Sequence, residues 1–253
     1  MIDIDKAKKT FMEYIKNYNP DDPKIKLKID HMLRVTEVAG RIAKDLKLSE
    51  EDIQLAKLIG LLHDIGRFEQ IKQYNTFLDK ISINHGEFGV KVLFEDNLIR
   101  KFIEDSSYDE IIRLAILNHN RPHIQKDLNE RQMLHAKIIR DADKVDIYYY
   151  STTEDIRVTY NTDKLEKDLF TPEIIEDFLQ YQAIDYKKIK THADVVISNL
   201  YYIYDLNFDI SKKMIKEKKY IDILYNKIHF ENEETQKQFD MVYTKVINDL
   251  NNM

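Results

Sequence analysis

The sequence predicts an all-α protein whose helices are joined by short connections. Only five glycines and four prolines interrupt the 253 residues. Lys, Glu, Asp, Ile and Leu dominate the composition, and apolar residues recur at helical spacing along most of the chain. A hydrophobic content of 43% is enough to fill a core.

Helices are expected in the first part of the chain from residue 3 or 5 to 18, from 24 to 46, from 49 to 66, after a cap at 82 or 84, from 109 to 118, and from 129 onward. Ser49-Glu50-Glu51-Asp52 has the form of a capping box. Residues 67–81 show little periodicity and are expected to form a loop. That loop is either a substrate wall or lid, or an ordinary surface excursion.

The later part of the chain is expected to be helical as well. Thr171-Pro172 predicts a helix start, and further helices are expected at 193–206, 211–228 and 233–250. Tyr148-Tyr149-Tyr150 and the tyrosines at 201–204 are interpreted as packing between helices, since no basic residues are interleaved. A weak change in the sequence after residue 160 predicts two parts. Residues 1–160 would form a metal-binding catalytic core that begins with a lead-in helix, and residues 161–253 a helical extension packed on this core.

Charge and composition exclude several function classes. The formal net charge of -6 argues against general binding to a nucleic-acid polymer, which requires a basic face. The absence of cysteine excludes disulfides, thiolate metal sites and a cysteine nucleophile. The N-terminal stretch lacks an apolar signal core and no apolar run could span a bilayer, so we expect a cytoplasmic protein without a membrane partner. The sequence leaves open whether the protein forms a homo-oligomer.

Six side chains of metal-ligating type stand near the ends or inner faces of the expected helices: His31, His63, Asp64, His85, His119 and Asp143. A single histidine on an apolar face is more often a hydrogen-bonded core residue. His63 and Asp64, however, are adjacent at the end of an apolar helical stretch, where the carboxylate could bind one metal or bridge two. Facing helices of a bundle build metal centres from such side chains.

In order and spacing these residues resemble the HD-domain superfamily, whose core pattern is a histidine, a His-Asp pair and a distal aspartate. The resemblance covers roughly residues 25–150 and implies an HD-domain helical bundle with additional C-terminal helices. It implies one metal held by His31, His63, Asp64 and Asp143. His85 and His119 match the extra histidines of binuclear members, which implies a second metal with Asp64 bridging. The mixed ligands suit Fe, Mn, Zn or Co, with Mg admitted.

Departures from better-known branches narrow this resemblance. The cyclic-dinucleotide branch has a second histidine at the position of Asn120 and a Gly-Tyr-Pro signature, both absent from this sequence. The alarmone hydrolases have a Glu-Asp arrangement soon after the His-Asp pair, where this chain has Gly66-Arg67-Phe68-Glu69. The stretches HDIGRFEQ, YNTFLD and SINHGEFG resemble a bacterial subgroup of HD proteins, which gives no substrate.

The resemblance implies metal-dependent hydrolysis of a phosphoester or phosphoanhydride in a small molecule, with a nucleotide as the favoured class. A metal-activated hydroxide would be the nucleophile, and Asp64 would be a catalytic residue through its place at the metals. Arg67 is expected to bind a non-bridging phosphate oxygen, because its planar guanidinium matches the geometry of phosphate and it lies one turn beyond the His63-Asp64 pair. Lys144 and His123 are further candidates for phosphate contact or leaving-group protonation.

Each of these three candidates has a plainer explanation. Arg67 could pair with Glu69 or Asp79. Lys144 could pair with Asp141, and His123 could face solvent. Two other function classes also stay open. Some binuclear members that resemble this six-ligand set are mixed-valent di-iron oxygenases that cleave carbon bonds. The third class is a non-catalytic ligand-sensing module with a structural metal.

Overall fold

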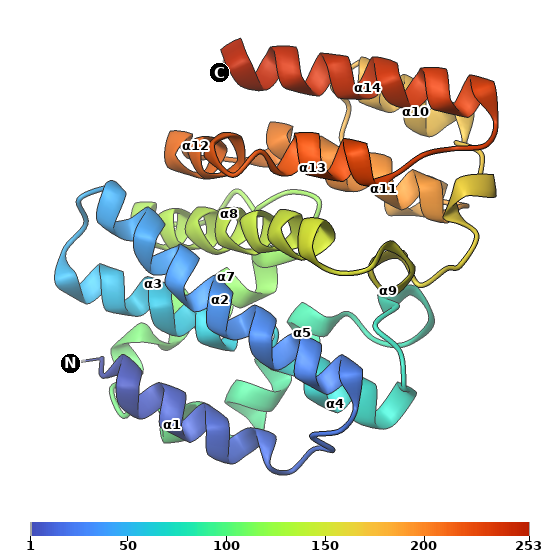
Figure 1. Cartoon of the computed structure of the whole chain (residues 1–253). Helices are drawn as coiled ribbons and strands as arrows, with labels where there is room; N and C mark the ends of the chain where they lie inside the picture. Colours follow the sequence, from blue (N-terminus) through green and yellow to red (C-terminus); the bar gives the residue numbers. More distant parts are fainter. Residues whose placement is uncertain (1, 253) are drawn as a thin grey trace. The chain divides into compact units, whose positions relative to one another are not determined.

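The computed structural model describes residues 2–252, which form helices and no strand (Figure 1). The all-α prediction is therefore confirmed. The chain divides into two compact units, residues 1–143 and residues 144–253. The division falls inside helix α8 (Glu130–Thr153), earlier than the boundary expected after residue 160, and the domain description at 1–160 and 161–253 stays a prediction.

The first unit contains seven complete helices among its described residues, followed by the start of α8. They are α1 (Ile4–Ile15), α2 (Pro23–Asp45), α3 (Glu50–Leu62), α4 (Gly66–Tyr74), α5 (His85–Val90), α6 (Ile99–Phe102) and α7 (Asp109–His119). Short 3₁₀ segments lie at Asp79–Ile81 and Ser106–Tyr108, and a π-helical turn spans Lys91–Glu95. The expected caps at Ser49 and Asn84 are confirmed, because each side chain accepts a hydrogen bond from a backbone N–H of the first turn.

The loop expected at 67–81 is wrong over its first half, where the chain forms α4. Phe68 and Ile71 bury one face of this short helix, and Gln70 is also fully buried. The Gln70 side-chain amide donates hydrogen bonds to Asp79 Oδ1, Ser82 Oγ and the Ile83 carbonyl. A buried glutamine interrupts the apolar pattern in the sequence, which is why periodicity misses the helix.

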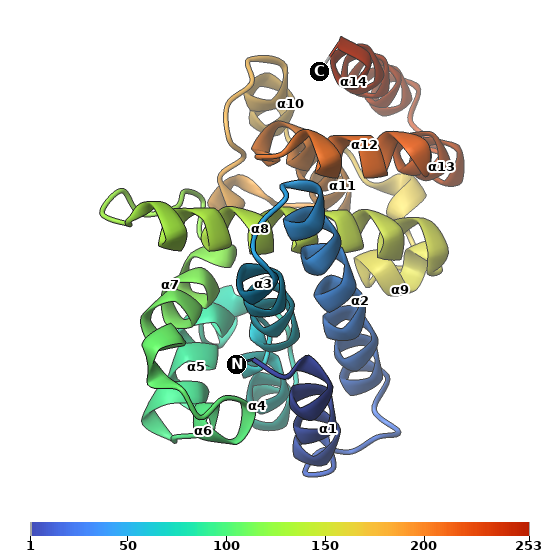
Figure 2. The same cartoon turned by 90° about the vertical axis from the view of Figure 1, so that its left-hand side faces the viewer.

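Two glycines allow helices of the first unit to approach closely. α2 and α3 lie side by side (Figure 2), and a Cβ on Gly60 would lie only 3.0 Å from Thr36 Cα and from the Val35 carbonyl oxygen. A Cβ on Gly66 would lie 2.5 Å from Gly89 N, where α4 meets α5. Because both contacts are with backbone, these crossings need a residue without a side chain.

Aromatic rings join α1 to α4. The Phe68 ring packs edge-on against the rings of Phe11 and Tyr14, with centroids 5.9 and 6.1 Å apart. Phe11 and Phe68 are fully buried, so the helix that begins the chain forms part of this unit's core.

The second unit contains the rest of α8 and six further helices among its described residues. They are α9 (Ile156–Tyr160), α10 (Pro172–Leu179), α11 (His192–Tyr201), α12 (Asp209–Glu217), α13 (Tyr220–Lys227) and α14 (Glu233–Asn252). The helix start at Thr171-Pro172 is confirmed. The single helix expected at 211–228 is wrong, because Lys219 adopts a left-handed φ of 53° that separates α12 from α13. The helix expected to run to residue 206 changes to a 3₁₀ turn after Tyr201.

Several aromatic side chains of the second unit pack in its core. Tyr148 is 1% exposed, and its hydroxyl donates a hydrogen bond to the Leu200 carbonyl at 3.2 Å. Phe170, Phe230 and Phe239 pack ring against ring in the core, with centroid separations of 5.0 to 6.4 Å. Within residues 2–252, no helix has the length and apolar character needed to cross a membrane.

Candidate metal centre

The His-Asp pair lies on the tight turn between α3 and α4. The turn is closed by hydrogen bonds from Ile65 N to the Leu62 carbonyl and from Arg67 N to the Asp64 carbonyl. His63 is fully buried and Asp64 is 2% exposed. The turn therefore points two neighbouring side chains into the interior, which a regular helix would set about 100° apart.

One set of donors gathers on the Oδ2 side of Asp64. His31 comes from α2 and Asp143 from α8, and His31 Nε2 lies 3.2 Å from Asp143 Oδ1 and 3.2 Å from His63 Nε2. Asp64 Oδ2 is 3.6 Å from His31 Nε2 and 3.7 Å from His63 Nε2. Two imidazoles and two carboxylates thus face one point.

A second set gathers on the Oδ1 side of the same carboxylate. His85 is the first residue of α5 and His119 the last of α7, and their Nε2 atoms are 3.0 Å apart. Asp64 Oδ1 is 3.5 Å from His85 Nε2 and 3.7 Å from His119 Nε2. Asp64 is therefore the one side chain that both sets share.

The proton positions on three of the histidines follow from what their other ring nitrogens contact. Nδ1 lies 2.8 Å from the Gly60 carbonyl in His63, and 2.5 Å from the Ile116 carbonyl in His119. A carbonyl only accepts, so each Nδ1 carries a proton, and in the neutral ring Nε2 is then the nitrogen that presents a lone pair. In His85, Nδ1 lies 2.6 Å from Asp79 Oδ2, which has the same effect.

The Nε2 atoms of these histidines converge in a buried part of the unit. Burial, aided by the charge of Arg67, lowers the pKa of His85 to about 3, and burial also lowers the pKa of His63. Asp64 Oδ1 is buried and makes no hydrogen bond to any described residue. Two imidazole nitrogens only 3.0 Å apart, beside a buried carboxylate oxygen without a hydrogen bond, are polar atoms that a cation among them would satisfy. The residues present therefore fit a metal.

The donor atoms fall into three overlapping groups, each within 4.8 Å: His31, His63 and Asp64; His63, His119 and Asp143; and Asp64, His85 and His119. The structure thus brings together the six side chains singled out in the sequence. Imidazole and carboxylate donors suit Fe, Mn, Zn or Co, and the set is large enough for one ion or two. Which ion binds, and through which of these atoms, stays a prediction.

Arg67 lies beside this cluster, and its contacts combine two of the expected alternatives. Its Nη1 donates hydrogen bonds to Asp79 Oδ1 at 3.0 Å and to the Phe77 carbonyl at 2.7 Å. Its Nε is 3.6 Å from Asp64 Oδ1, is buried, and makes no hydrogen bond to the described part of the chain. Arg67 thus pairs with Asp79 and still directs one N–H towards the cluster.

Two charged side chains in contact with the cluster were not singled out in the sequence as site residues. Lys28 Nζ lies 2.6 Å from Asp64 Oδ2. Burial alone would raise the pKa of Asp64, but the charge of Lys28 helps to hold this pKa well below 3.8. Asp79 orients His85 and also accepts from Arg67. The only signal for Lys28 was its position three residues before His31, which places both on one face of α2.

Lys144 and His123 are not among the gathered donors. Lys144 is the neighbour of Asp143 in α8, and its Nζ pairs with Asp205 Oδ2 at 2.8 Å. Successive residues of a helix point about 100° apart, so Lys144 does not face the donor cluster even though Asp143 does. His123 is exposed in the segment that follows α7.

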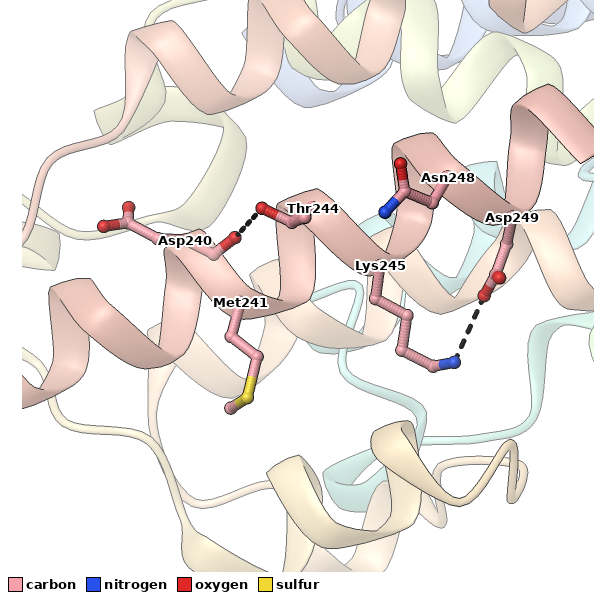
Figure 3. Close-up of a pocket in the computed structure, with 6 residues that line it drawn as sticks. All are labelled: Asp240, Met241, Thr244, Lys245, Asn248 and Asp249. Atoms are coloured by element: carbon pink, nitrogen blue, oxygen red, sulfur yellow. Dashed lines mark hydrogen bonds and ion pairs between the residues drawn. The ribbon is translucent and has the colours of Figure 1, made fainter.

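A shallow hollow of about 520 Å³ lies along α14 (Figure 3). Its polar side chains largely satisfy one another, since Lys245 Nζ lies 3.2 Å from Asp249 Oδ2 and the Thr244 hydroxyl donates to the Asp240 carbonyl. It contains no histidine. We assign no chemistry to it.

Residues 29–148 match the family model for the HD domain. Neither the comparison with curated proteins nor the comparison with solved structures gave a match. The matched segment begins in α2, ends in α8 and contains all six gathered donors. It is this segment, rather than the whole chain, that matches the HD-domain superfamily.

Proposed function

We propose that this protein is a metal-dependent phosphohydrolase acting on a small phosphoester or phosphoanhydride, with nucleotides as the favoured class. The observation that carries the proposal is the position of Asp64, whose two oxygens face two adjoining sets of donors. That arrangement suits two cations joined by one carboxylate, and paired cations are a common solution for displacement at phosphorus.

Bound divalent cations would neutralise charge on the phosphoryl oxygens and activate water as the nucleophile. The chain's own residues would fix where this occurs. His63 and His119 are held by carbonyls of their own helices and His85 by Asp79, so the three imidazoles are already oriented. Arg67 is proposed to bind a non-bridging phosphate oxygen through its Nε–H, which makes no hydrogen bond to the described residues.

The test is phosphate release from a panel of nucleotides and small phosphoesters, measured anaerobically with protein reconstituted with Mn²⁺, Zn²⁺, Co²⁺ or Fe²⁺. Asp64→Ala and His63→Ala are expected to lose roughly 10³-fold or more in rate, because several kcal/mol of transition-state stabilisation depend on the bound metal. His229→Ala, at an exposed histidine of the second unit, is the matched control and should keep full activity.

Retention of activity by Asp64→Ala would refute the proposal. Oxygen consumption by the iron-loaded protein, with no phosphate release across the panel, would instead assign it to the oxygenases that share the ligand pattern. Elemental analysis of protein purified without chelator accompanies both assays and gives the number of metals per chain.

A further inference from the structure

Lys28 places a positive charge directly on the shared carboxylate. Its Nζ lies 2.6 Å from Asp64 Oδ2, and its side chain is 16% exposed. Lys26, two residues earlier on α2, is exposed to solvent. A lysine that leaves water for a buried aspartate is unusual, because its ammonium is strongly hydrated and usually stays at the surface.

This contact competes with a metal at the same oxygen. Asp64 Oδ2 is also the oxygen that faces His31 and His63 at 3.6 and 3.7 Å. A divalent cation among these atoms would repel an ammonium held 2.6 Å from the same oxygen. The Lys28–Asp64 pair and a metal in the first donor set therefore exclude each other in this geometry.

The surroundings give the displaced ammonium a second place beside the cluster. Lys28 Nζ lies 5.4 Å from the centroid of the Phe77 ring, and Arg67 Cζ lies 5.4 Å from the same centroid. The lysine stem has four flexible carbons, so Nζ can leave Asp64 without leaving the ring. Two cations that share one aromatic ring repel each other unless an anion lies between them.

We propose that Lys28 exchanges partners: it neutralises Asp64 when the first donor set holds no metal, and it binds a phosphate group of the substrate when metal is present. Phosphate is the shared chemistry, whether it comes from substrate or product. The inference rests on the proposed function for its second half only. Lys28 thus acts as an internal competitor of the metal and as a substrate ligand, two roles with opposite consequences.

The opposite consequences make the proposal testable without turnover. Lys28→Gln removes the competing charge, so the affinity for Mn²⁺ or Zn²⁺ alone, measured by calorimetry, is expected to rise about tenfold, within the range usual for coupled sites. Inorganic phosphate added to the metal-loaded variant is expected to bind ~10- to 100-fold more weakly than to wild type, the loss expected for a charged hydrogen bond. Lys26→Gln, with the same charge change at an exposed position of α2, should alter neither affinity.

Metal binding that is unchanged or weaker in Lys28→Gln overturns the proposal, and so does unchanged binding of phosphate. A merely structural lysine would weaken both ligands together. If Lys28→Gln does not fold without metal, two other variants replace it: Lys28→Met keeps the apolar stem and Lys28→Arg keeps the charge. Of these two, only Lys28→Met should bind the metal more tightly than wild type. Failure of the phosphohydrolase proposal is separate, since it would appear as metal and phosphate binding without hydrolysis of any phosphoester.

Discussion

Replacement of Asp79 by asparagine tests whether the second donor set depends on a residue that touches no metal. Asp79 Oδ2 accepts from His85 Nδ1 at 2.6 Å, while Oδ1 accepts from Arg67 Nη1 at 3.0 Å and from Gln70 Nε2 at 2.9 Å. Asparagine has nearly the same shape but only one acceptor oxygen. Its amide N–H groups must then face either the histidine or the arginine and glutamine donors, so part of the network is lost.

The magnitude follows from the role of Asp79 in orienting His85. Loss of a residue that orients a metal-bound histidine usually weakens metal binding by ~10- to 100-fold, equivalent to about 1.4 to 2.7 kcal/mol. Burial would raise the pKa of Asp79, but the hydrogen bond and charge of His85 hold it at about 2. Asp79 is thus charged at neutral pH, and its removal also deletes a negative charge near the cation, which acts in the same direction.

The assay is a metal titration against a chelator of known affinity. Asp79→Asn is expected to weaken one of two binding steps and to leave the step that depends on His31 and Asp143 nearly unchanged. Asp52→Asn is the matched control. Asp52 also accepts a hydrogen bond from a histidine, His135, at 3.0 Å, but among the described residues it contacts none of the six donors. Equal weakening of both steps, or no change in either, would refute the reasoning.

Other predictions concern stability. Gly66→Ala should destabilise the protein by about 1–3 kcal/mol in urea unfolding, since the new methyl would lie 2.5 Å from the His85 carbonyl oxygen. Gly40→Ala should cost less than Gly66→Ala, because the three atoms nearest the new methyl there all belong to the flexible Lys57 side chain and the helix propensity of alanine offsets part of the crowding; destabilisation equal to that of Gly66→Ala would contradict this. Burial lowers the pKa of His135 below 6.5, although its hydrogen bond to Asp52 raises it, so the unfolded chain binds a proton first and stability should fall as the pH drops below 6.5. His135→Gln should reduce the dependence of the unfolding free energy on pH by up to ~1.4 kcal/mol per pH unit. An unchanged dependence would show that His135 does not cause the loss of stability.

Much of the fold could be predicted because local chemistry determines it. Capping side chains at Ser49 and Asn84 begin helices where the sequence predicts them, and the proline after Thr171 begins another. The errors arise where tertiary contacts override local pattern. Gln70 is buried because three acceptors surround it, and Lys219 takes a left-handed conformation that no pattern of apolar residues predicts.

The candidate site was predictable in its donors and much less so in its surroundings. Histidine and aspartate at the ends of apolar helices are conspicuous, and the structure gathers all six; their binding of metal stays a prediction. Lys28 gave little signal, because lysine on an amphipathic helix is ordinarily a solvated surface residue. Only the three-dimensional structure shows that this one reaches Asp64.

The way each imidazole is anchored divides the centre into parts with different capacity to evolve. His63 and His119 donate their Nδ1 protons to the carbonyls of Gly60 and Ile116, one turn earlier in their own helices. No substitution can delete a carbonyl, so these two ligands keep their tautomer while neighbouring side chains drift. His85 depends on the side-chain carboxylate of Asp79, which lies at the start of a 3₁₀ segment and which a single base change can replace. Natural variation in metal preference should therefore concentrate on the His85 side of the centre.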